Sequence, residues 1–227
     1  MGSAVTVREL RRLWKPIKEG AGASPAHEPI RIRLHRCFSW MQRVETVGAI
    51  DPDDAALDAH LIFRWTALKA LYGRWDDERR EPAGDRMTLN GFTRRITQVD
   101  AGGRIGRLLE TDRPLLEKLV GDEFLLRHYW EDPEIDVAGK TSGAARKLRE
   151  TVREARHPRT LDDVLGRVYL LRCQLVHGAA TFNGRQNRTA VRRAARFLEL
   201  LLPDVLTIII EHNWDGDWSG LCYPPRR

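Results

Sequence analysis

Apolar residues recur at steps of three and four along most of the chain, which is the period of an amphipathic α-helix. The clearest example is residues 54–74, which begin at an acidic run suited to a helix N-terminus. Its apolar stripe consists of Leu57, Leu61, Trp65, Leu68, Leu71 and Tyr72. Shorter patterns predict helices at 5–14, ending near Pro16, and at 29–48.

The last third of the chain predicts a pair of long helices at 160–177 and 187–212. Gly178 is a natural terminator of the first helix, because glycine readily adopts the left-handed conformation that follows a helix end. The stripe of the first helix comprises Leu161, Leu165, Val168, Leu171 and Leu175. The second helix carries Pro203, which can kink it.

The middle of the chain is less regular. Residues 76–87 are charged and predict an exposed loop, and residues 88–158 show short helical pieces broken by glycine and proline. Residues 132–143 predict a mobile loop. No segment alternates convincingly as a strand does, so the pattern predicts an all-α fold.

The helical pieces suggest one domain with a helical lobe inserted into it. The predicted core is about 30–75 and 160–212, and the predicted insertion is about 76–158. The tail 213–227 is an aromatic coil. We expect it to pack on the body of the protein through Trp214, Trp218 or Tyr223.

Composition places the chain among soluble globular proteins, since 42% of its 227 residues are hydrophobic and 31% are charged. The net charge of +6 is unevenly spread: residues 1–140 hold 23 basic and 23 acidic residues, and residues 141–227 hold 15 and 9. The surplus in the last third suits a polyanion such as RNA. Solvated helix faces in an arginine-rich protein explain the same charge without any partner.

The three cysteines Cys37, Cys173 and Cys222 are an odd number without a CxxC spacing. They favour a reducing compartment and argue against a disulfide framework or a zinc site. The most apolar run, 197–210, contains Glu199, Pro203 and Asp204 and is too short to span a bilayer. The N-terminus lacks a signal-peptide pattern. The sequence therefore predicts a cytoplasmic protein that uses no membrane, metal or cofactor.

Candidate chemistry lies in one short string at the end of the 160–177 helix, where Arg172 precedes His177 by five positions. Histidine can act as general base or acid near neutral pH, and arginine can hold a phosphate and stabilise developing charge. On a regular helix the two side chains diverge by about 140°. They converge only if the helix breaks near Gly178 or if two copies of the protein present the motif to each other. The alternative is an arginine paired to a carboxylate and a histidine that closes the helix.

This region resembles the C-terminal part of HEPN-domain proteins (higher eukaryotes and prokaryotes nucleotide-binding), in particular the bacterial Apea-like and related uncharacterised branches. Arg172 and His177 match the Rx4–6H motif, and the loop 178–183 with Asn187-Arg188 is similar to the sequence that follows it. Upstream, the string 63–73, FRWTALKALYG, resembles the first-half helix of that branch, and the CYPP string of the tail is also similar. The resemblance covers about 30–75 and 160–225.

The resemblance implies an up-and-down bundle of four or five helices that dimerises with its two motifs facing one cleft. It also implies a metal-independent endoribonuclease that leaves a 2′,3′-cyclic phosphate and acts in toxin–antitoxin, abortive-infection or CRISPR-associated defence. Arg172 would then contact the phosphate and His177 would be the acid/base. A cognate antitoxin or another defence-system protein would be a partner.

Three positions depart from the family pattern. Cys173 follows the motif arginine where a polar residue, commonly Asn, is usual, and Ala179 replaces the tyrosine that one toxin branch carries. Lys69 stands where Asn is expected, and it either contacts phosphate or is solvated. Asn183 and Arg188 follow the motif closely and are candidate substrate-binding residues, whereas Asn187 is better explained as a helix cap.

Two readings of function therefore stand, with a weaker third. The first is the endoribonuclease with Arg172 and His177 of both subunits in one site. The second is a non-catalytic HEPN module that binds RNA, a nucleotide or a protein, which Cys173 and Lys69 slightly favour. The third is DNA binding through the basic last third, which no helix-turn-helix spacing supports.

Overall fold

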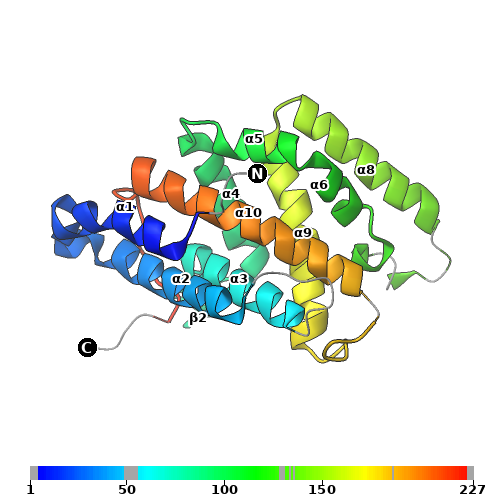
Figure 1. The fold of residues 1–227 in the computed structure, drawn as a ribbon, viewed down its shortest axis with the longest axis horizontal. Helices are drawn as coiled ribbons and strands as arrows, with labels where there is room; N and C mark the ends of the chain where they lie inside the picture. The colour runs from blue at the N-terminus through cyan, green and yellow to red at the C-terminus, as the bar shows by residue number, and fades with distance from the viewer. Residues whose placement is uncertain are drawn as a thin grey trace. The chain divides into compact units, whose positions relative to one another are not determined.

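A computed structural model describes residues 5–48, 56–127, 131–132, 134, 136–185 and 187–223 (Figure 1). Helices dominate this part of the chain, which confirms the predicted all-α class. The α-helices are α1 (Val7–Glu19), α2 (Glu28–Val47), α3 (Leu57–Tyr72), α4 (Asp85–Val99), α5 (Arg104–Thr111), α6 (Arg113–Val120), α8 (Val137–Arg153), α9 (His157–Val176) and α10 (Arg188–His212). Single 3₁₀ turns are η1 (Ala21–Ala23), η2 (Pro25–His27) and η3 (Glu123–Leu125).

The chain forms two compact units. Unit 1 comprises residues 1–48, 63–102 and 202–227, and unit 2 comprises residues 49–62 and 103–201. Helices α3 and α10 each contribute one part to each unit. The single domain with an insertion at 76–158 stays a prediction, although the unit boundaries fall elsewhere: residues 76–102 belong to unit 1 and residues 103–158 to unit 2.

Helix α1 opens unit 1 with a capping box, in which Thr6 and Glu9 exchange hydrogen bonds. Pro16 was expected to end this helix, but α1 continues to Glu19. Proline removes only its own N–H, and the turn after it still closes, because the Gly20 N–H donates to the carbonyls of Pro16 and Ile17. Helix α1 packs against α2 and the 3₁₀ turn η1 (Figure 1).

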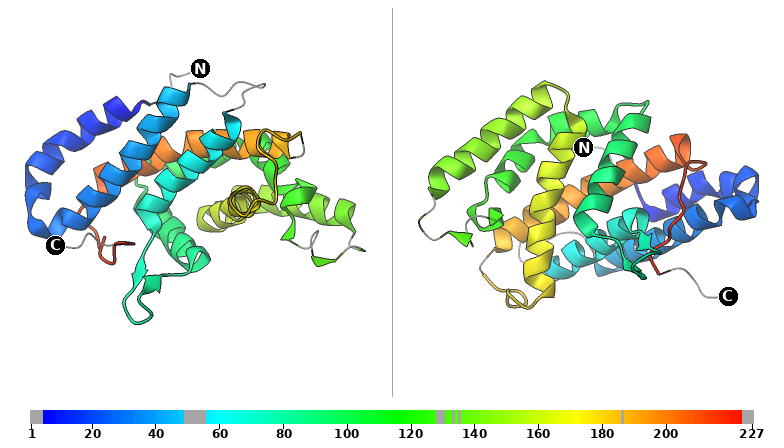
Figure 2. Two further views of the ribbon diagram at one scale, coloured as in Figure 1. Left: turned by 90° about the horizontal axis from the view of Figure 1, so that it is seen from below. Right: turned by 180° about the vertical axis from the view of Figure 1, so that it is seen from behind.

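Two short strands, β1 (Trp75–Asp76) and β2 (Glu81–Pro82), pair antiparallel within unit 1 (Figure 2). The sequence predicts a loop over residues 76–87 and no strand. Strands of two residues are too short to display an alternating pattern. The turn between them is fixed locally, because the Asp76 carboxylate accepts the N–H groups of Glu78 and Arg79 at 3.1 Å.

The tail packs within unit 1 as expected. Trp218 is buried, and its indole N–H donates to the carbonyl of Asn213 at 2.8 Å. Trp214 lies edge-on to His27, with ring centroids 5.0 Å apart. Tyr223 is exposed, although its ring centroid lies 5.4 Å from that of Trp75.

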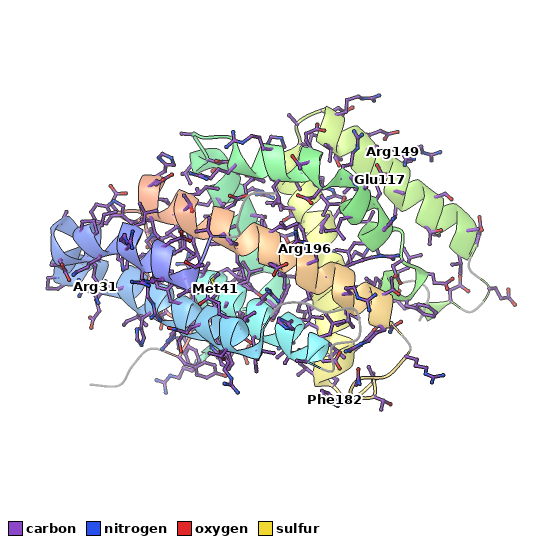
Figure 3. The ribbon with its side chains drawn as sticks, in the orientation of Figure 1. Arg31, Met41, Glu117, Arg149, Phe182 and Arg196 are labelled. Carbon is purple, nitrogen blue, oxygen red and sulfur yellow. The ribbon has the colours of Figure 1, made fainter. Side chains whose placement is uncertain are left out.

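Helix α9 is the central element of unit 2 and packs against α5, α6, α8 and η3. Its inward stripe agrees with the prediction at Leu161, Leu165, Val168 and Leu171. Helix α8 lies along α6, where Arg149 donates to Glu117 at 2.8 Å (Figure 3).

Helix α8 begins inside the segment 132–143 that was predicted to be a mobile loop. The Asp136 carboxylate accepts the Gly139 N–H at 2.9 Å and so caps the helix start. The first turns of α8 contain glycines and a threonine, which have low helix propensity, so the sequence does not predict a helix there. Across the described residues, no helix combines the length and the apolar character that a bilayer span requires.

Candidate active site

Helix α9 ends at the motif that the sequence singles out. Gly178 has φ of 73°, a left-handed conformation that glycine adopts without steric cost. The Ala179 N–H donates to Gln174 at 2.8 Å and the Gly178 N–H to Leu175 at 3.3 Å, which is the pattern of a Schellman motif. The helix therefore ends as Gly178 predicts. His177 occupies the C-cap, and its side chain is exposed to solvent.

Arg172 lies half-buried on the last turns of α9. Its Nη1 contacts the Cys173 sulfur at 3.9 Å, which is a weak interaction. No carboxylate among the described residues forms an ion pair with it. The expected alternative, an arginine neutralised by a nearby acid, is therefore not what this part of the chain shows.

Tyr169 completes this cluster, one turn before Cys173. Burial raises the pKa of the Tyr169 hydroxyl, a hydrogen bond with Cys173 raises it further, and Arg172 lowers it. Because the net shift is upward, the phenol keeps its proton at neutral pH. The end of α9 thus combines a guanidinium, a phenol and a thiol in one cluster, and it carries an exposed imidazole at its C-cap.

The loop 178–187 leads from this helix end to the start of α10 (Figure 2). Gly178, Asn183 and Asn187 all have positive φ, at 73°, 53° and 61°. Glycine and asparagine tolerate this conformation better than other residues do. The sequence thus supplies suitable residues at the three sharp turns of the loop.

Asp58 of α3 fixes the position of the 178–187 loop by hydrogen bonds. Its two carboxylate oxygens accept the Asn183 backbone N–H at 2.8 Å and the Arg188 guanidinium at 3.0 Å. The Asp58 and Arg188 side chains are only 12% and 16% exposed, so this charge-assisted pair is poorly screened by water. One carboxylate therefore fixes both the turn at Asn183 and the first residue of α10.

A second tie comes from Gln174 in the last turn of α9. Its amide donates to the Phe124 carbonyl at 3.1 Å and accepts from the Asn187 amide at 3.1 Å. Asn187 was interpreted as a helix cap, but its side-chain amide reaches back to Gln174 instead. The left-handed backbone of Asn187 directs the side chain away from the N–H groups of α10.

The predicted site residues divide between the units. Arg172, His177, Asn183 and Arg188 all belong to unit 2, on one helix end and the loop that follows it. Asn183 is exposed, whereas Arg188 is engaged by Asp58. Lys69 belongs to unit 1, where it pairs with Asp85 and lies 5.1 Å from the Tyr72 ring centroid. Its side chain is partly buried, and its role toward substrate stays a prediction.

Three residues of this region were missed. In the sequence, Asp58 cannot be told from any other acidic residue in the first turn of a helix, because its partners lie more than 100 residues away. Tyr169 could have been found, since it precedes Arg172 by three positions and so shares its helix face. Phe182 is 71% exposed on the loop (Figure 3), which is unusual for a large aromatic side chain.

Within the described ranges, no three His, Cys, Asp or Glu side chains are placed to share a metal ion. Comparison of the chain with protein-family models, with curated proteins and with solved structures found no match. The geometry at the end of α9 and the sequence motif are therefore the basis on which function is argued.

Proposed function

We propose that this protein is a metal-independent endoribonuclease of HEPN type, in which Arg172 and His177 act on the scissile phosphodiester of RNA. The observation that carries the proposal is that Arg172 forms no ion pair with a carboxylate of the described residues and that His177, five positions later at the same helix end, is exposed. Both groups are thus available to a ligand. The Rx4–6H spacing noted above supports the same assignment.

Arg172 suits the role of phosphate ligand. On the regular helix α9, His177 lies about 7.5 Å further along the axis than Arg172 and about 140° around it, so the side chains of one copy diverge and the proposed site needs the motif of a second copy. A guanidinium donates to two phosphate oxygens at once and stabilises the negative charge that builds on phosphorus during the reaction. Tyr169 and Cys173 border it and can orient it.

His177 suits the role of acid/base, because its side chain is exposed and an imidazole can both accept and donate a proton. In the proposed reaction a neutral His177 takes the proton of the ribose 2′-hydroxyl. The 2′-oxygen then attacks phosphorus, the bond to the 5′-oxygen breaks, and a 2′,3′-cyclic phosphate forms. A protonated His177 of the partner subunit gives its proton to the leaving 5′-oxygen, so that protons balance without water or metal.

The partner subunit in this scheme is a second copy of the chain. A stripe of incompletely buried residues runs along α9, formed by Gly166, Tyr169, Cys173 and Val176 at helical spacing, and Val176 is 50% exposed. The Gly166 position is open, since an added Cβ there would meet no atom within 4 Å. A twofold axis beside this stripe would bring the two Arg172–His177 motifs together, so that one site would contain two arginines and two histidines.

RNA is the polyanion that this loop suits. Phe182 presents an exposed ring for a base to stack on, and Arg185, which follows in the same loop, is exposed as well. Asn183 offers an amide between them. In keeping with the resemblance, we place such a nuclease in the cytoplasm as a defence or toxin effector with a cognate antitoxin or defence partner.

The test is cleavage of labelled structured RNA by the purified full chain in EDTA, followed by analysis of the 3′ ends. We expect 2′,3′-cyclic phosphate ends from the unmodified protein. The variants His177→Ala and Arg172→Ala should each lower the rate by about 100-fold or more. The matched control is His35→Ala, because His35 is an exposed histidine on α2 in the other unit. This variant should cleave normally.

Two further readouts separate catalysis from binding. Phe182→Ala should weaken RNA affinity by about tenfold with little change in the rate at saturating RNA. Val176→Asp should convert a dimer to a monomer by light scattering and abolish cleavage with it. Binding without cleavage by the unmodified protein would contradict the nuclease and favour a non-catalytic RNA-binding module.

A further inference from the structure

Unit 1 contains a cavity that plays no part in the proposed ribonuclease site. Its volume is about 630 Å³, within the range typical of small-molecule sites. The end of α3, strand β1, helix α4 and the tail residues 217–219 form its walls. All of these segments belong to unit 1.

Three guanidinium groups line this cavity. Arg33 is 2% exposed and donates to six backbone carbonyls, so its hydrogen bonds are used within the fold. Arg95 has its guanidinium carbon 4.1 Å from the Trp218 ring centroid and donates to the Asp217 carbonyl at 2.6 Å. The buried Nε of Arg95 has no hydrogen-bond partner among the described residues.

Arg74 lies at the mouth of the cavity, and its guanidinium rests against Gly220. A Cβ added at Gly220 would lie 3.4 Å from Nε and from Nη2 of Arg74. The glycine therefore leaves room for the guanidinium beside the cavity. Arg74 is exposed, so it remains accessible to a ligand that enters.

The positive charges are close enough to repel one another. Burial, followed by the charges of Arg74 and Arg95, lowers the pKa of Arg33 to about 10. Burial and then Arg74 also lower the pKa of Arg95. Carbonyl acceptors satisfy hydrogen bonds but carry no full negative charge, so a bound anion would relieve this repulsion.

The carboxylates near the cavity offset this charge only in part: Asp217 raises the pKa of Arg95, but burial and Arg74 lower it more. Asp76 accepts two N–H groups of the hairpin turn, and Asp217 is exposed and accepts the Ser219 N–H at 3.0 Å. Asp77 and Glu78 are exposed at the rim. None of them accepts a hydrogen bond from the buried Nε of Arg95, which has no partner among the described residues.

The remaining wall is aromatic. Tyr72, Phe92 and Trp218 are each at least nine-tenths buried, and each lines the cavity. Met87, which is 72% exposed, lies at the opening. A flat apolar group would replace water against these surfaces.

We infer that this cavity binds a small organic anion, with an oxyanion head group on Arg74 and Arg95 and a flat apolar body against the aromatic wall. Phosphate and carboxylate share the head-group chemistry, because both accept two N–H groups of a guanidinium in parallel. The size of the cavity suits one aromatic ring system and its head group, with water in the remaining space.

The test uses the full-length chain and four probes in isothermal calorimetry and thermal unfolding. Phenyl phosphate and benzoate carry both features, whereas inorganic phosphate and phenol each carry one. We expect phenyl phosphate or benzoate to bind and to raise Tm, and the tighter of the two identifies the head group. Inorganic phosphate and phenol should bind at least about tenfold more weakly.

Variants locate the site. Arg74→Met and Arg95→Met should each weaken binding by at least about tenfold, since each removes a charged donor to the anion. Arg94→Met is the matched control, because Arg94 is the exposed neighbour on α4 and should leave affinity unchanged. Arg74 is exposed, so its variant should retain the fold, as circular dichroism will show.

Three outcomes would overturn the inference. The first is that neither composite probe binds at millimolar concentration. The second is that inorganic phosphate binds as tightly as phenyl phosphate, which would make the aromatic wall irrelevant. The third is that the two arginine variants bind as the unmodified protein does. None of these outcomes affects the RNA-cleavage test, whose residues lie in unit 2.

Discussion

Several half-buried or buried arginines of unit 1 donate to backbone carbonyls, whereas two half-buried arginines of unit 2, Arg188 and Arg193, pair with carboxylates. In unit 1, Arg33 and Arg36 on α2 bind carbonyls of the C-terminal tail, and Arg95 on α4 does the same. Among the half-buried arginines of unit 2, Arg188 pairs with Asp58 and Arg193 with Asp122, whereas Arg167 donates to the Leu125 carbonyl.

The difference matters because a carbonyl satisfies the donors of a guanidinium without cancelling its charge. Unit 1 therefore keeps positive charge next to its cavity, which Asp217 offsets only in part. In unit 2, Arg188 and Arg193 are neutralised by carboxylates. Arg172 forms no ion pair with a carboxylate of the described residues, so its guanidinium is available for an external anion, such as a phosphodiester.

The largest expected effect on stability tests the arginine–carbonyl hydrogen bonds of unit 1. Arg33→Met removes the donor to six carbonyls and leaves them in a buried setting. We expect a loss of about 3 kcal/mol in the free energy of unfolding, because unsatisfied buried acceptors are costly. Urea denaturation followed by circular dichroism measures this loss.

Arg43→Met is the matched control for this variant, since Arg43 is exposed on the same helix. It should change stability by no more than about 0.5 kcal/mol. Arg33→Lys should recover only part of the loss, because one ammonium group cannot reach acceptors arranged around a planar fork. A full recovery by lysine would show that charge, and not the fork of donors, holds the tail.

A smaller expected effect on stability tests the arginine–carboxylate pairs of unit 2. Asp58→Asn should lower the free energy of unfolding by about 2 kcal/mol, since the poorly exposed Arg188 loses its charged partner. The same change loosens the turn at Asn183. RNA cleavage should therefore fall by about tenfold, mainly through misplacement of the loop relative to His177.

Glu150→Gln is the control for Asp58→Asn, because it removes an exposed acid of unit 2 on α8. It should change neither stability nor cleavage. The double variant Asp58→Asn/Arg188→Gln should be less destabilised than the sum of the two single variants, because the two groups interact directly. Strict additivity would mean that the pair contributes nothing as a pair.

The helices could be read from the sequence wherever one face is apolar over several turns. Helices α2, α3, α9 and α10 agree with their predicted ranges to within a few residues at each end. Helix α8 and the β1–β2 hairpin could not be read in this way, because local contacts and not an apolar stripe specify them. The Asp136 cap and the Asp76 turn are examples of such contacts.

The candidate site was predictable only along the helix that carries it. Arg172, His177 and Gly178 lie close together in sequence, so both their chemistry and the resemblance of the motif could identify them. Asp58 could not be found, because its contact with Asn183 spans 125 positions and nothing local encodes it. The grouping of the arginines around the cavity in unit 1 could not be predicted from the sequence either, since three distant segments bring them together.

The smallest expected effect concerns two carboxyl groups that the two units shift in opposite directions. In unit 1, hydrogen bonds from the side chain and N–H of Ser219 lower the pKa of Asp217, whereas in unit 2 burial raises the pKa of Asp122 despite the charge of Arg193. The ordinary value in an unfolded chain is about 3.9.

The signs of the two contributions to stability follow from these shifts. Asp217 stabilises the fold above its unfolded pKa, and this contribution is lost as pH falls through its lowered folded pKa. The contribution of Asp122 is fully present below its unfolded pKa and is lost as pH rises through its raised folded pKa. A carboxyl-carbon NMR titration should therefore show Asp122 titrating at higher pH than Asp217, with Asp122→Asn and Asp217→Asn assigning the two signals. Coincident midpoints would mean that solvent screens both groups and that the two units do not differ in how they treat charge.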